Sequence, residues 1–515
     1  MGAQVERDEA TCVKLLSDLF ATNSFYFARG QDAGRGYDLT RTLQSIVEQA
    51  PGTARLPRWR QVEDRFVWNY HMLRAFTRDA SAAAALDAFV VPVISGYVEV
   101  LESCVVRDVR FSLVFVSRRC RHRQGTRFHR RGVDAAGFVA NFVETEQILV
   151  RQDGSMSSFV QIRGSIPLFW KQPCTLRYTP KVALTAPPPQ TTDAFRAHMQ
   201  RESSRFGGVL AVNLVDKKRD QQVLGDAFER EVLKLDSPRV RYVWFDFHHE
   251  CRKMRWHNLS RLMDRVREQL DSFGYLDVDQ HGAVRRRQKG VARTNCMDNL
   301  DRTNVVQSLF ARHSLLSQLD AHAGGEHVLD SPYPEFEPRF KALWANNADR
   351  MSVLYSGTPA LKTDFTRTGK RTLNGLVQDG YNSVMRYYLN NFRDGDRQDA
   401  FDLLLGEHDF DGSAAPVTPF ARRQGNPAVL FLAELAVLAF GLGAVAYYTT
   451  PSEYRTTRVV ATVFVASLTF LGTIYAYGKK GLKRGVQYVQ QPCLVHDEPL
   501  KRKDTKGRSW SPVNP

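Results

Sequence analysis

A twelve-residue polar stretch past the middle of the chain most constrains what it can fold into. Residues 293–304 read RTNCMDNLDRTN, and five residues separate Cys296 from Arg302. Apolar side chains then repeat at helical spacing, at Val305, Val306, Leu309 and Phe310. A loop that enters a helix in this way directs backbone N–H groups and the positive end of the helix dipole toward one point. The stretch therefore predicts an anion-binding loop that contains a cysteine.

The residue types in this loop suit the transfer of a phosphoryl group to sulfur. A bound phosphate would accept hydrogen bonds from the backbone amides and two more from the guanidinium of Arg302. The same positive field favours the thiolate of Cys296, which is the form that attacks phosphorus. Cys104 also has an arginine six residues on, Arg110, but it lies in an apolar run typical of a strand. We assign the nucleophile to Cys296, against the alternative that this residue is a buried structural thiol.

The composition bounds the number of domains and the class of partner. With 515 residues, 43% of them hydrophobic, the chain can form two or three domains with sizeable cores. Its formal net charge of +16 favours nucleic acid, anionic membrane or phosphorylated ligands. No zinc-ligand cysteine pairs and no RNA-binding aromatic signature accompany that charge, so nucleic acid is not an expected partner. The seven cysteines are scattered and odd in number, which indicates a reducing compartment.

Two long apolar runs near the C-terminus predict a membrane anchor. Residues 427–448 carry one charge, Glu434, and residues 459–477 carry none. As helices they would span roughly 33 Å and 28 Å at about 1.5 Å per residue. Basic residues precede the first run at 422–423 and follow the second at 479–484, so the positive-inside rule places both chain ends in the cytosol. The alternative is a buried hairpin within a domain core.

The remainder of the chain mixes apolar runs with amphipathic stretches. The predicted strands are 109–117, 208–215 and 240–247, and the predicted helices are 257–274 and 374–392. Strands interleaved with helices indicate an α/β head. Residues 406–426 mix Gly, Pro and charge and are expected to form a linker, followed by the hairpin at 427–477 and a basic, disordered cytosolic tail at 478–515.

The loop resembles that of the Sac-type phosphoinositide phosphatases, which often reads RTNCMDCLDRTN. This chain differs from it once, because Asn299 stands in place of the second cysteine, and that cysteine is not the nucleophile. Other segments are similar to the family at 25–45, 65–76, 117–149, 158–170, 212–229, 245–262 and 360–392. The two apolar runs resemble the anchor of the member found in the endoplasmic reticulum and Golgi.

The resemblance implies a fold, an activity and a location. It implies a cysteine-phosphatase-like catalytic domain over residues 87–405 and a smaller, β-rich N-terminal domain over residues 1–86, which begins inside the family's usual pattern. It implies phosphatidylinositol 4-phosphate as the main substrate, with the 3-phosphate and the 3,5-bisphosphate as lesser ones, and no cofactor. It also implies an anchor in the membrane of the endoplasmic reticulum, and also of the Golgi.

The loop residues can be given roles. Cys296 would form a cysteinyl-phosphate, Arg302 would stabilise the phosphoryl oxygens, and Thr303 would donate a hydrogen bond to the sulfur. An inward-facing carboxylate beside a phosphate should have a raised pKa and could protonate the inositol oxygen. We favour Asp298 for this role, as the resemblance also suggests. The alternative reading of Asp301 is an outward residue that caps the helix.

Other residues are candidates for contacts with the lipid. The expected substrate contacts are Asn295, Met297, Asn299, Leu300 and Asp301 in the loop, with Lys362, Arg367, Lys370 and Arg371 after it. A basic hairpin suits an anionic membrane surface. Its members are Arg118, Arg119, Arg121, Arg123, Arg127, Arg130 and Arg131. His248 and His249, with Glu250, could suggest a metal, but adjacent strand residues point to opposite faces, so we expect a structural role and no metal.

Three functions are compatible with these features. The favoured one is a membrane-anchored phosphoinositide phosphatase with a metal-free cysteine mechanism. A membrane-bound phosphotyrosine phosphatase would share the loop chemistry. A non-catalytic, lipid-binding membrane tether would not need Cys296, Asp298 and Arg302 together, so their presence argues against it.

Overall fold

The computed structural model describes residues 2–28, 38–49, 58–77, 89–252, 255–320, 333–369, 371–407, 420 and 490–494. The two predicted apolar runs, nearly all of the predicted linker and most of the tail lie outside this description, as does Lys370. Within the described residues, no helix combines the length and the apolar character that a bilayer crossing requires.

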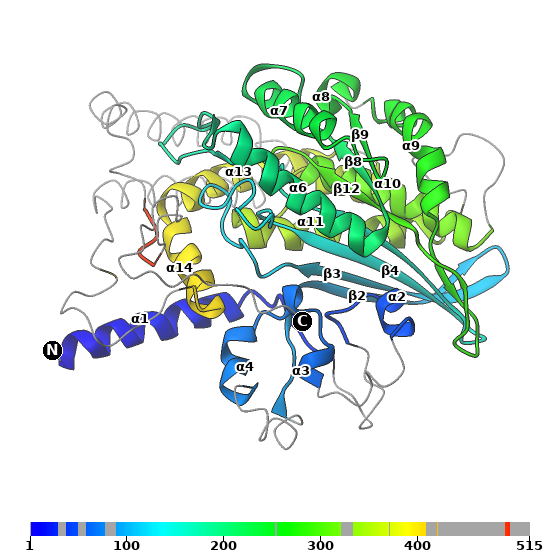
Figure 1. Cartoon of the computed structure of the whole chain (residues 1–515), viewed down its shortest axis with the longest axis horizontal. Coiled ribbons are helices and arrows are strands. Elements are labelled where there is room, and N and C mark those ends of the chain that lie inside the picture. The colour runs from blue at the N-terminus through cyan, green and yellow to red at the C-terminus, as the bar shows by residue number, and fades with distance from the viewer. Residues whose placement is uncertain are drawn as a thin grey trace, which may run out of the picture.

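A ten-stranded mixed sheet organises the head (Figure 1). Eight strands follow one another in the order β1-β2-β3-β4-β5-β12-β8-β9, and β10 joins β5 and β11 beside them. The strands are β1 (Phe25–Tyr26), β2 (Ile94–Val106), β3 (Val109–Arg119), β4 (Val143–Arg151), β5 (Met156–Arg163), β8 (Gly208–Asn213), β9 (Val240–Trp244), β10 (Leu276–Val278), β11 (Val284–Arg286) and β12 (Gly290–Asn295). Pairing is antiparallel from β1 to β5 and parallel from β5 through β12 and β8 to β9.

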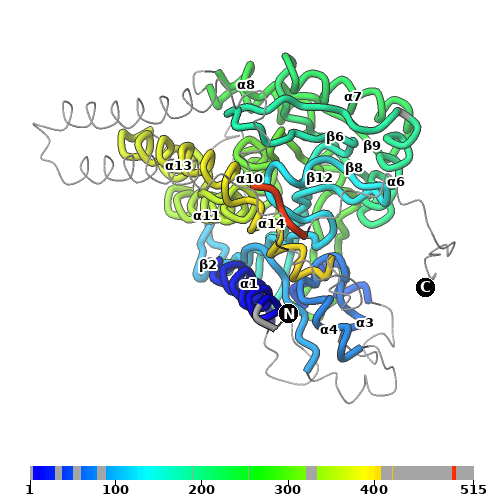
Figure 2. The backbone as a smooth tube through the Cα atoms, turned by 90° about the vertical axis from the view of Figure 1, so that its left-hand side faces the viewer, coloured from blue at the N-terminus to red at the C-terminus, as the bar shows by residue number. Residues whose placement is uncertain are grey.

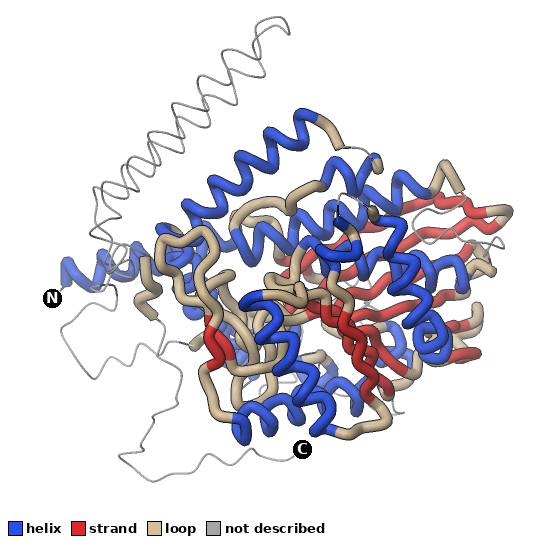
Figure 3. Tube along the Cα trace, turned by 90° about the horizontal axis from the view of Figure 1, so that it is seen from above, coloured by secondary structure: helices blue, strands red, loops and turns tan. Residues whose placement is uncertain are grey.

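Helices cover both faces of the parallel part of the sheet (Figure 3). On one face they are α6 (Pro188–Phe206) and α7 (Arg219–Leu235), and on the other α8 (Phe247–Glu250), α9 (Leu259–Phe273) and α10 (Asp301–Gln318). α11 (Glu337–Ser356) packs on the antiparallel strands, and α12 (Thr363–Thr368), α13 (Leu373–Phe392) and α14 (Asp394–Leu405) follow it in the chain. Successive residues of a strand face opposite sides. Val209 and Ala211 of β8 accordingly pack with α6 and α7, whereas Leu210 and Val212 pack with α9 and α10. A separate two-stranded sheet pairs β6 (Trp170–Lys171) with β7 (Ala183–Leu184).

The N-terminal segment is mainly helical where the structure describes it. It contains α1 (Gly2–Phe20), α2 (Leu43–Val47), α3 (Arg58–Gln61) and α4 (Tyr70–Thr77). Its short strand β1 pairs with β2, and β2 continues into the ten-stranded sheet. Among the described residues of 1–86 there is no separate β-rich domain, so that expectation is wrong for them. The segment instead extends one edge of the common sheet and packs α1 against α14 (Figure 2).

Part of the C-terminal tail returns to the head. The backbone N–H groups of Cys493 and Leu494 donate to the carboxylate of Asp399 on α14, at 2.7 and 2.8 Å. The Leu494 side chain is buried with Trp68 and Phe401. In Figure 1 this red segment lies beside α14. The prediction that the tail is disordered is therefore wrong for residues 490–494, because a buried carboxylate holds their backbone.

The predicted strands and helices of the head correspond closely to β3, β8, β9, α9 and α13. The main difference is at 245–250, where β9 stops at Trp244. Asp246 then caps α8, and its side chain accepts from the backbone N–H of His249. His248 and His249 therefore lie on a short helix and not on a strand, so the strand argument used for them was wrong.

Candidate active site

The loop that contains Cys296 leaves the centre of the sheet. β12 is entirely buried between β5 and β8 and runs parallel to both. Asn295 ends the strand, and its side chain donates to the side chain of Asn213 at 2.7 Å. Asn299 adopts φ +56°, a left-handed conformation that asparagine tolerates, and donates to the carbonyl of Asn141 at 3.0 Å. The chain turns there and enters α10 at Asp301, as the sequence predicts.

Cys296 lies at the wall of a cavity of about 690 Å³. Side chains from five parts of the fold meet there: the 127–128 turn, the 172–180 loop, the 247–256 segment, the loop at 296–302 with the start of α10, and helices α11 to α13 with the loops between them. The charged residues of the lining are Arg127, Arg177, Arg252, Asp298, Asp301, Arg302, Lys362 and Arg386. The five arginines and one lysine outnumber the two carboxylates, so the cavity suits an anion larger than free phosphate.

Arg302 is held at the carboxyl end of β8. Its Nη1 donates to the carbonyl of Leu214 and to a carboxylate oxygen of Asp216, both at 3.0 Å. His248 also contacts Asp216, at 2.9 Å. Burial would raise the pKa of Asp216, but the hydrogen bond with His248 and the charge of Arg302 hold it below its ordinary value. Asp216 therefore stays ionised and fixes one edge of the Arg302 guanidinium.

Asp298 is clamped by two arginines. Its carboxylate accepts from Nη2 of Arg127 and from Nη2 of Arg131, each at 2.6 Å. Burial alone would raise the pKa of Asp298, but the two guanidinium groups outweigh it and hold the pKa well below its ordinary value. The raised pKa expected for Asp298 is therefore wrong for this arrangement. Its role as proton donor is not tested by the structure and stays a prediction.

Asp301 has the opposite electrostatic setting. It lines the cavity and accepts from the backbone N–H of Leu361 at 3.3 Å, so it is not the outward residue of the alternative reading. Burial raises its pKa, the charge of Arg386 opposes the rise, and the nearby carboxylate of Asp298 adds to it. Of the two loop acids, Asp301 is the one that the structure keeps closer to its protonated form.

The structure separates the other predicted contact residues into two groups. Leu300 and Lys362 line the cavity with Cys296. Asn295, Met297, Asn299, Thr303, Arg367 and Arg371 are absent from the lining. Thr303 is fully buried, and its hydroxyl has no hydrogen-bond partner among the described residues.

The two arginines after the loop are engaged elsewhere. Arg367 pairs with Asp349 at 3.1 Å. Arg371 pairs with Asp364 at 2.5 Å and also with Asp379. Each guanidinium already has a carboxylate partner, so direct headgroup contact by either would require an ion pair to break.

The predicted basic hairpin is not one surface. Arg118 and Arg119 are fully buried, and Arg131 is 3% exposed. Arg127 and Arg131 instead turn inward and clamp Asp298. The expectation of a single lipid-facing basic patch is wrong for these residues, because the loop carboxylate neutralises two of them.

Sequence reasoning missed several residues of the cavity. Arg386 on α13 is 7% exposed and donates to the carbonyl of Pro359 at 2.8 Å, beside Asp301. Trp256 stacks on Phe365 with ring centroids 5.1 Å apart. An arginine at a core-facing position of a helix, as Arg386 is within VMRYYLNNF, is the one local signal that could have pointed to the site.

Comparison with known proteins identifies the family. Residues 2–252 match the model described as the SacI homology domain. A protein of Drosophila melanogaster named phosphatidylinositol-3-phosphatase SAC1 is 41% identical over 505 residues, which cover 95% of this chain and 80% of that protein. The protein of the same name in Saccharomyces cerevisiae is 36% identical over 513 residues, or 96% and 78% of the two chains. Phosphatidylinositol-3-phosphatase SAC1-B of Danio rerio is 44% identical over 405 residues, or 78% and 67%. The chain therefore belongs to the SacI homology family.

Proposed function

We propose that this protein is a membrane-anchored phosphoinositide phosphatase that hydrolyses phosphatidylinositol monophosphates through a cysteinyl-phosphate. The observation that carries the proposal is the position of Cys296, which lies in a loop at the start of α10 and in the wall of a cavity with six basic side chains. Relatives along nearly the whole chain are named phosphoinositide or phosphatidylinositol phosphatases. The basic cavity beside Cys296 and the names of the relatives together support a phosphoinositide as the substrate class.

The reaction has two steps on the Cys296 sulfur. In the first, the thiolate forms an S–P bond, the P–O bond to the inositol breaks, and a carboxyl group gives its proton to the departing oxygen. In the second, a water oxygen forms a new P–O bond and the S–P bond breaks. The water proton passes to the carboxylate, and the electron pair returns to the sulfur. Arg302 and the N–H groups of the loop would stabilise the phosphoryl oxygens in both steps.

The proton donor is one of two loop acids, and the structure supports Asp301. Asp298 is paired with Arg127 and Arg131, so its carboxylate is held ionised. Asp301 has a raised pKa and lies in the cavity lining. Asp298 could serve only if a substrate anion displaced it from the two arginines.

The position taken on the inositol ring is part of the proposal. The family resemblance supports the 4-phosphate as the main substrate and the 3-phosphate as another. The cavity accommodates an inositol ring, and its rim arginines, Arg177 and Arg252, could contact a second anionic group of the lipid.

The anchor is proposed from the apolar runs at 427–448 and 459–477, which lie outside the described residues. One structural finding supports a hairpin. The chain leaves the head after α14 and returns beside it, where the backbone N–H of Gln490 donates to the carbonyl of Asn391 at the end of α13 at 2.9 Å and that of Cys493 donates to Asp399 of α14 at 2.7 Å. An even number of crossings fits this return. We propose the endoplasmic reticulum and Golgi as the membranes, with both chain ends cytosolic.

Glycosylation mapping tests this topology. An acceptor site placed in a lengthened connector at 449–458 should be modified, because that connector would be lumenal. An acceptor placed after residue 495 should stay unmodified. Modification of the second site alone would reverse the proposed topology.

The function is tested by phosphate release from a panel of short-chain, soluble phosphoinositides, with a phosphotyrosine peptide in parallel. We expect release from the 4-phosphate and 3-phosphate lipids, little from the peptide, and none from any substrate with Cys296→Ser. Cys104→Ser is the matched control, because Cys104 is buried in β2 and burial raises the pKa of its thiol. Binding without release would favour the membrane tether, and preference for the peptide would favour the phosphotyrosine phosphatase.

A further inference from the structure

A buried arginine lies under the loop on the neighbouring strand. Arg163 is the last residue of β5, and it pairs in parallel register with Thr294 of β12, two residues before Cys296. The carboxyl ends of parallel strands lie at the same edge of a sheet. Arg163 therefore begins at the edge from which the Cys296 loop departs. It is not part of the cavity lining.

The burial of Arg163 is complete and its hydrogen bonding is absent. The residue is 1% exposed, and Nε, Nη1 and Nη2 have no hydrogen-bond partner among the described residues. A guanidinium offers five N–H donors, and a buried one is normally paired with a carboxylate or with carbonyl groups. A fold seldom retains an unpaired buried cation for stability alone.

Two groups supply the negative charge near Arg163. Burial lowers its pKa to about 10, and the charges that oppose this fall are those of Cys296 and Asp301. At neutral pH the guanidinium therefore keeps its positive charge. Because the pKa of Asp301 is raised, its carboxyl group is protonated more readily. In that neutral form it does not compete with the Cys296 thiolate for the positive charge of Arg163.

We propose that Arg163 is a positioning residue that stabilises negative charge on the Cys296 sulfur from beneath the loop. Only its consequence for turnover rests on the proposed function. When the S–P bond forms, the sulfur loses its negative charge; when that bond breaks, the electron pair returns to the sulfur. A fixed cation at this place favours the thiolate before the first step and its release in the second.

The remaining charges around the loop are distributed over several elements. The buried or part-buried groups that face this region are Asp298 in the loop, Arg127 and Arg131 from the 121–131 segment, Asp301 and Arg302 on α10, and Arg386 on α13. Across the cavity this region also faces Arg177, His248, Arg252 and Lys362. Asp298 is neutralised by its two arginines, and Arg302 is shared with Asp216. Arg163, below the loop, differs from these buried groups because none of its three side-chain nitrogens has a hydrogen-bond partner in the part of the chain that the structure describes.

The test is alkylation of Cys296 by iodoacetamide as a function of pH, in the full-length protein and without substrate. Trypsin should release residues 294–302, which contain one cysteine, so mass spectrometry can follow Cys296 alone. With Arg163→Gln we expect alkylation at pH 7 to fall about tenfold and the midpoint of the pH profile to rise by about one unit. Arg163→Lys, which keeps the charge, should lie close to the wild type.

Arg119→Gln is the matched control. Arg119 is also fully buried, it also has unpaired nitrogens, and it lies at the end of β3. Burial lowers its pKa to about 9, but Cys296 is not among the charges that act on it. Loss of Arg119 should leave the alkylation profile of Cys296 unchanged, because Arg119 does not act on that sulfur. A general loosening of the core, by contrast, would shift the profile in both variants.

The outcomes separate this proposal from the phosphatase proposal. A folded Arg163→Gln protein with the wild-type profile, or equal shifts in Arg163→Gln and Arg119→Gln, would overturn it. If Arg163→Gln does not fold, Arg163→Lys provides the test. A rise in the midpoint of its alkylation profile, although the positive charge is retained, would contradict the proposed role of that charge. A specific shift in a protein that releases no phosphate would uphold the role of Arg163 and reject the proposed function.

Discussion

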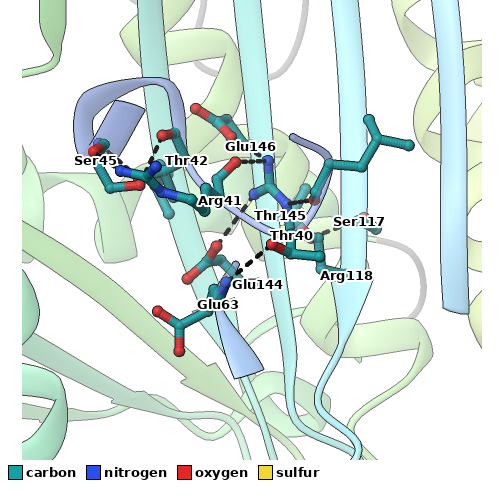
Figure 4. Close-up of polar contacts among 12 residues, drawn as sticks. Thr40, Arg41, Thr42, Ser45, Glu63, Ser117, Arg118, Glu144, Thr145 and Glu146 are labelled. Atoms are coloured by element: carbon teal, nitrogen blue, oxygen red, sulfur yellow. Dashed lines mark hydrogen bonds and ion pairs between the residues drawn. The ribbon is translucent and has the colours of Figure 1, made fainter. Parts of the chain in front are cut away.

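Two buried arginines on neighbouring parts of the sheet have opposite surroundings. Arg118 on β3 donates to Glu144 at 3.1 Å and to Glu146 at 2.5 Å, and to the carbonyl groups of Leu39 and Arg41 (Figure 4). Arg163 on β5 has no hydrogen-bond partner among the described residues. Both residues are almost fully buried. Arg118 is therefore a structural charge whose N–H donors have hydrogen-bond partners, whereas Arg163 is an unpaired charge placed near the reactive Cys296.

The satisfied network fastens the N-terminal segment to the sheet. Arg118 and Glu144 are direct partners in the register of β3 and β4. Glu146 also accepts from the backbone N–H of Leu43 at 2.8 Å, at the start of α2. Figure 4 shows these contacts converging from residues 40–45 onto the two strands. A buried charge with this many partners specifies a docking geometry.

The largest effect that sharpens the comparison is expected at Arg302, which would contact the transferred phosphoryl group. Arg302→Met should lower kcat on the order of a thousand-fold, because the charge that develops on the phosphoryl oxygens loses its partner. Steady-state phosphate release measures this, and thermal unfolding should show a folded protein. Activity within tenfold of the wild type would mean that Arg302 acts only on structure, as Arg118 does.

The next effect concerns the loop acids. Asp301→Asn should lower kcat by about a hundred-fold, and Asp298→Asn by less. A proton donor must be protonated, so wild-type activity should fall as pH rises through the raised pKa of Asp301, and Asp301→Asn should lose this alkaline limb. A pH–rate profile measures both. The reverse order of the two variants would return the donor role to Asp298.

The same substitution at the two buried arginines should then affect stability differently. Arg118→Met removes the guanidinium that Glu144 and Glu146 share in a buried site, and it should lower the free energy of unfolding by about 3–5 kcal/mol. Arg163→Met removes an unpaired buried cation and should change it little or raise it. Urea unfolding provides the measurement. Equal destabilisation at both positions would erase the distinction drawn here between the two regions.

The smallest expected effect is that of metal removal. The proposed mechanism draws its positive charge from Arg302 and backbone amides, so EDTA should leave the rate of phosphate release unchanged. Vanadate, which mimics the phosphoryl geometry, should inhibit. A loss of activity in EDTA that Mg²⁺ restores would mean that protein cations are insufficient at this site.

The parts of the site that could be predicted are those that are local in sequence. Cys296, Asp298 and Arg302 lie within one short loop, and the helical pattern after it locates the start of α10. The apolar runs also located β8 and most of β9, because the side chains of both strands pack against clusters on the two faces of the sheet; β9 ends at Trp244, three residues before the end of the predicted strand. Such features depend only on residues close together in the chain, so the sequence pattern is sufficient to predict them.

The parts that could not be predicted depend on distant pairing. Arg127 clamps Asp298 from 171 residues away, and nothing in its arginine-rich surroundings shows which members turn inward. The return of Cys493 to Asp399 spans 94 residues. The pKa shifts of Asp298 and Asp301 depend on such distant contacts. The sequence alone therefore predicted the raised pKa for Asp298, whereas the structure gives it to Asp301.

The most direct test of the account is to trap the intermediate. Rapid acid quenching of the wild-type protein with a phosphate-labelled, short-chain phosphatidylinositol 4-phosphate should leave label on the tryptic segment 294–302. Cys296→Ser should carry none, and Cys104→Ser should carry as much as the wild type. Turnover that proceeds with no label on this segment, or persists in Cys296→Ser, would contradict the assignment of Cys296 as the nucleophile.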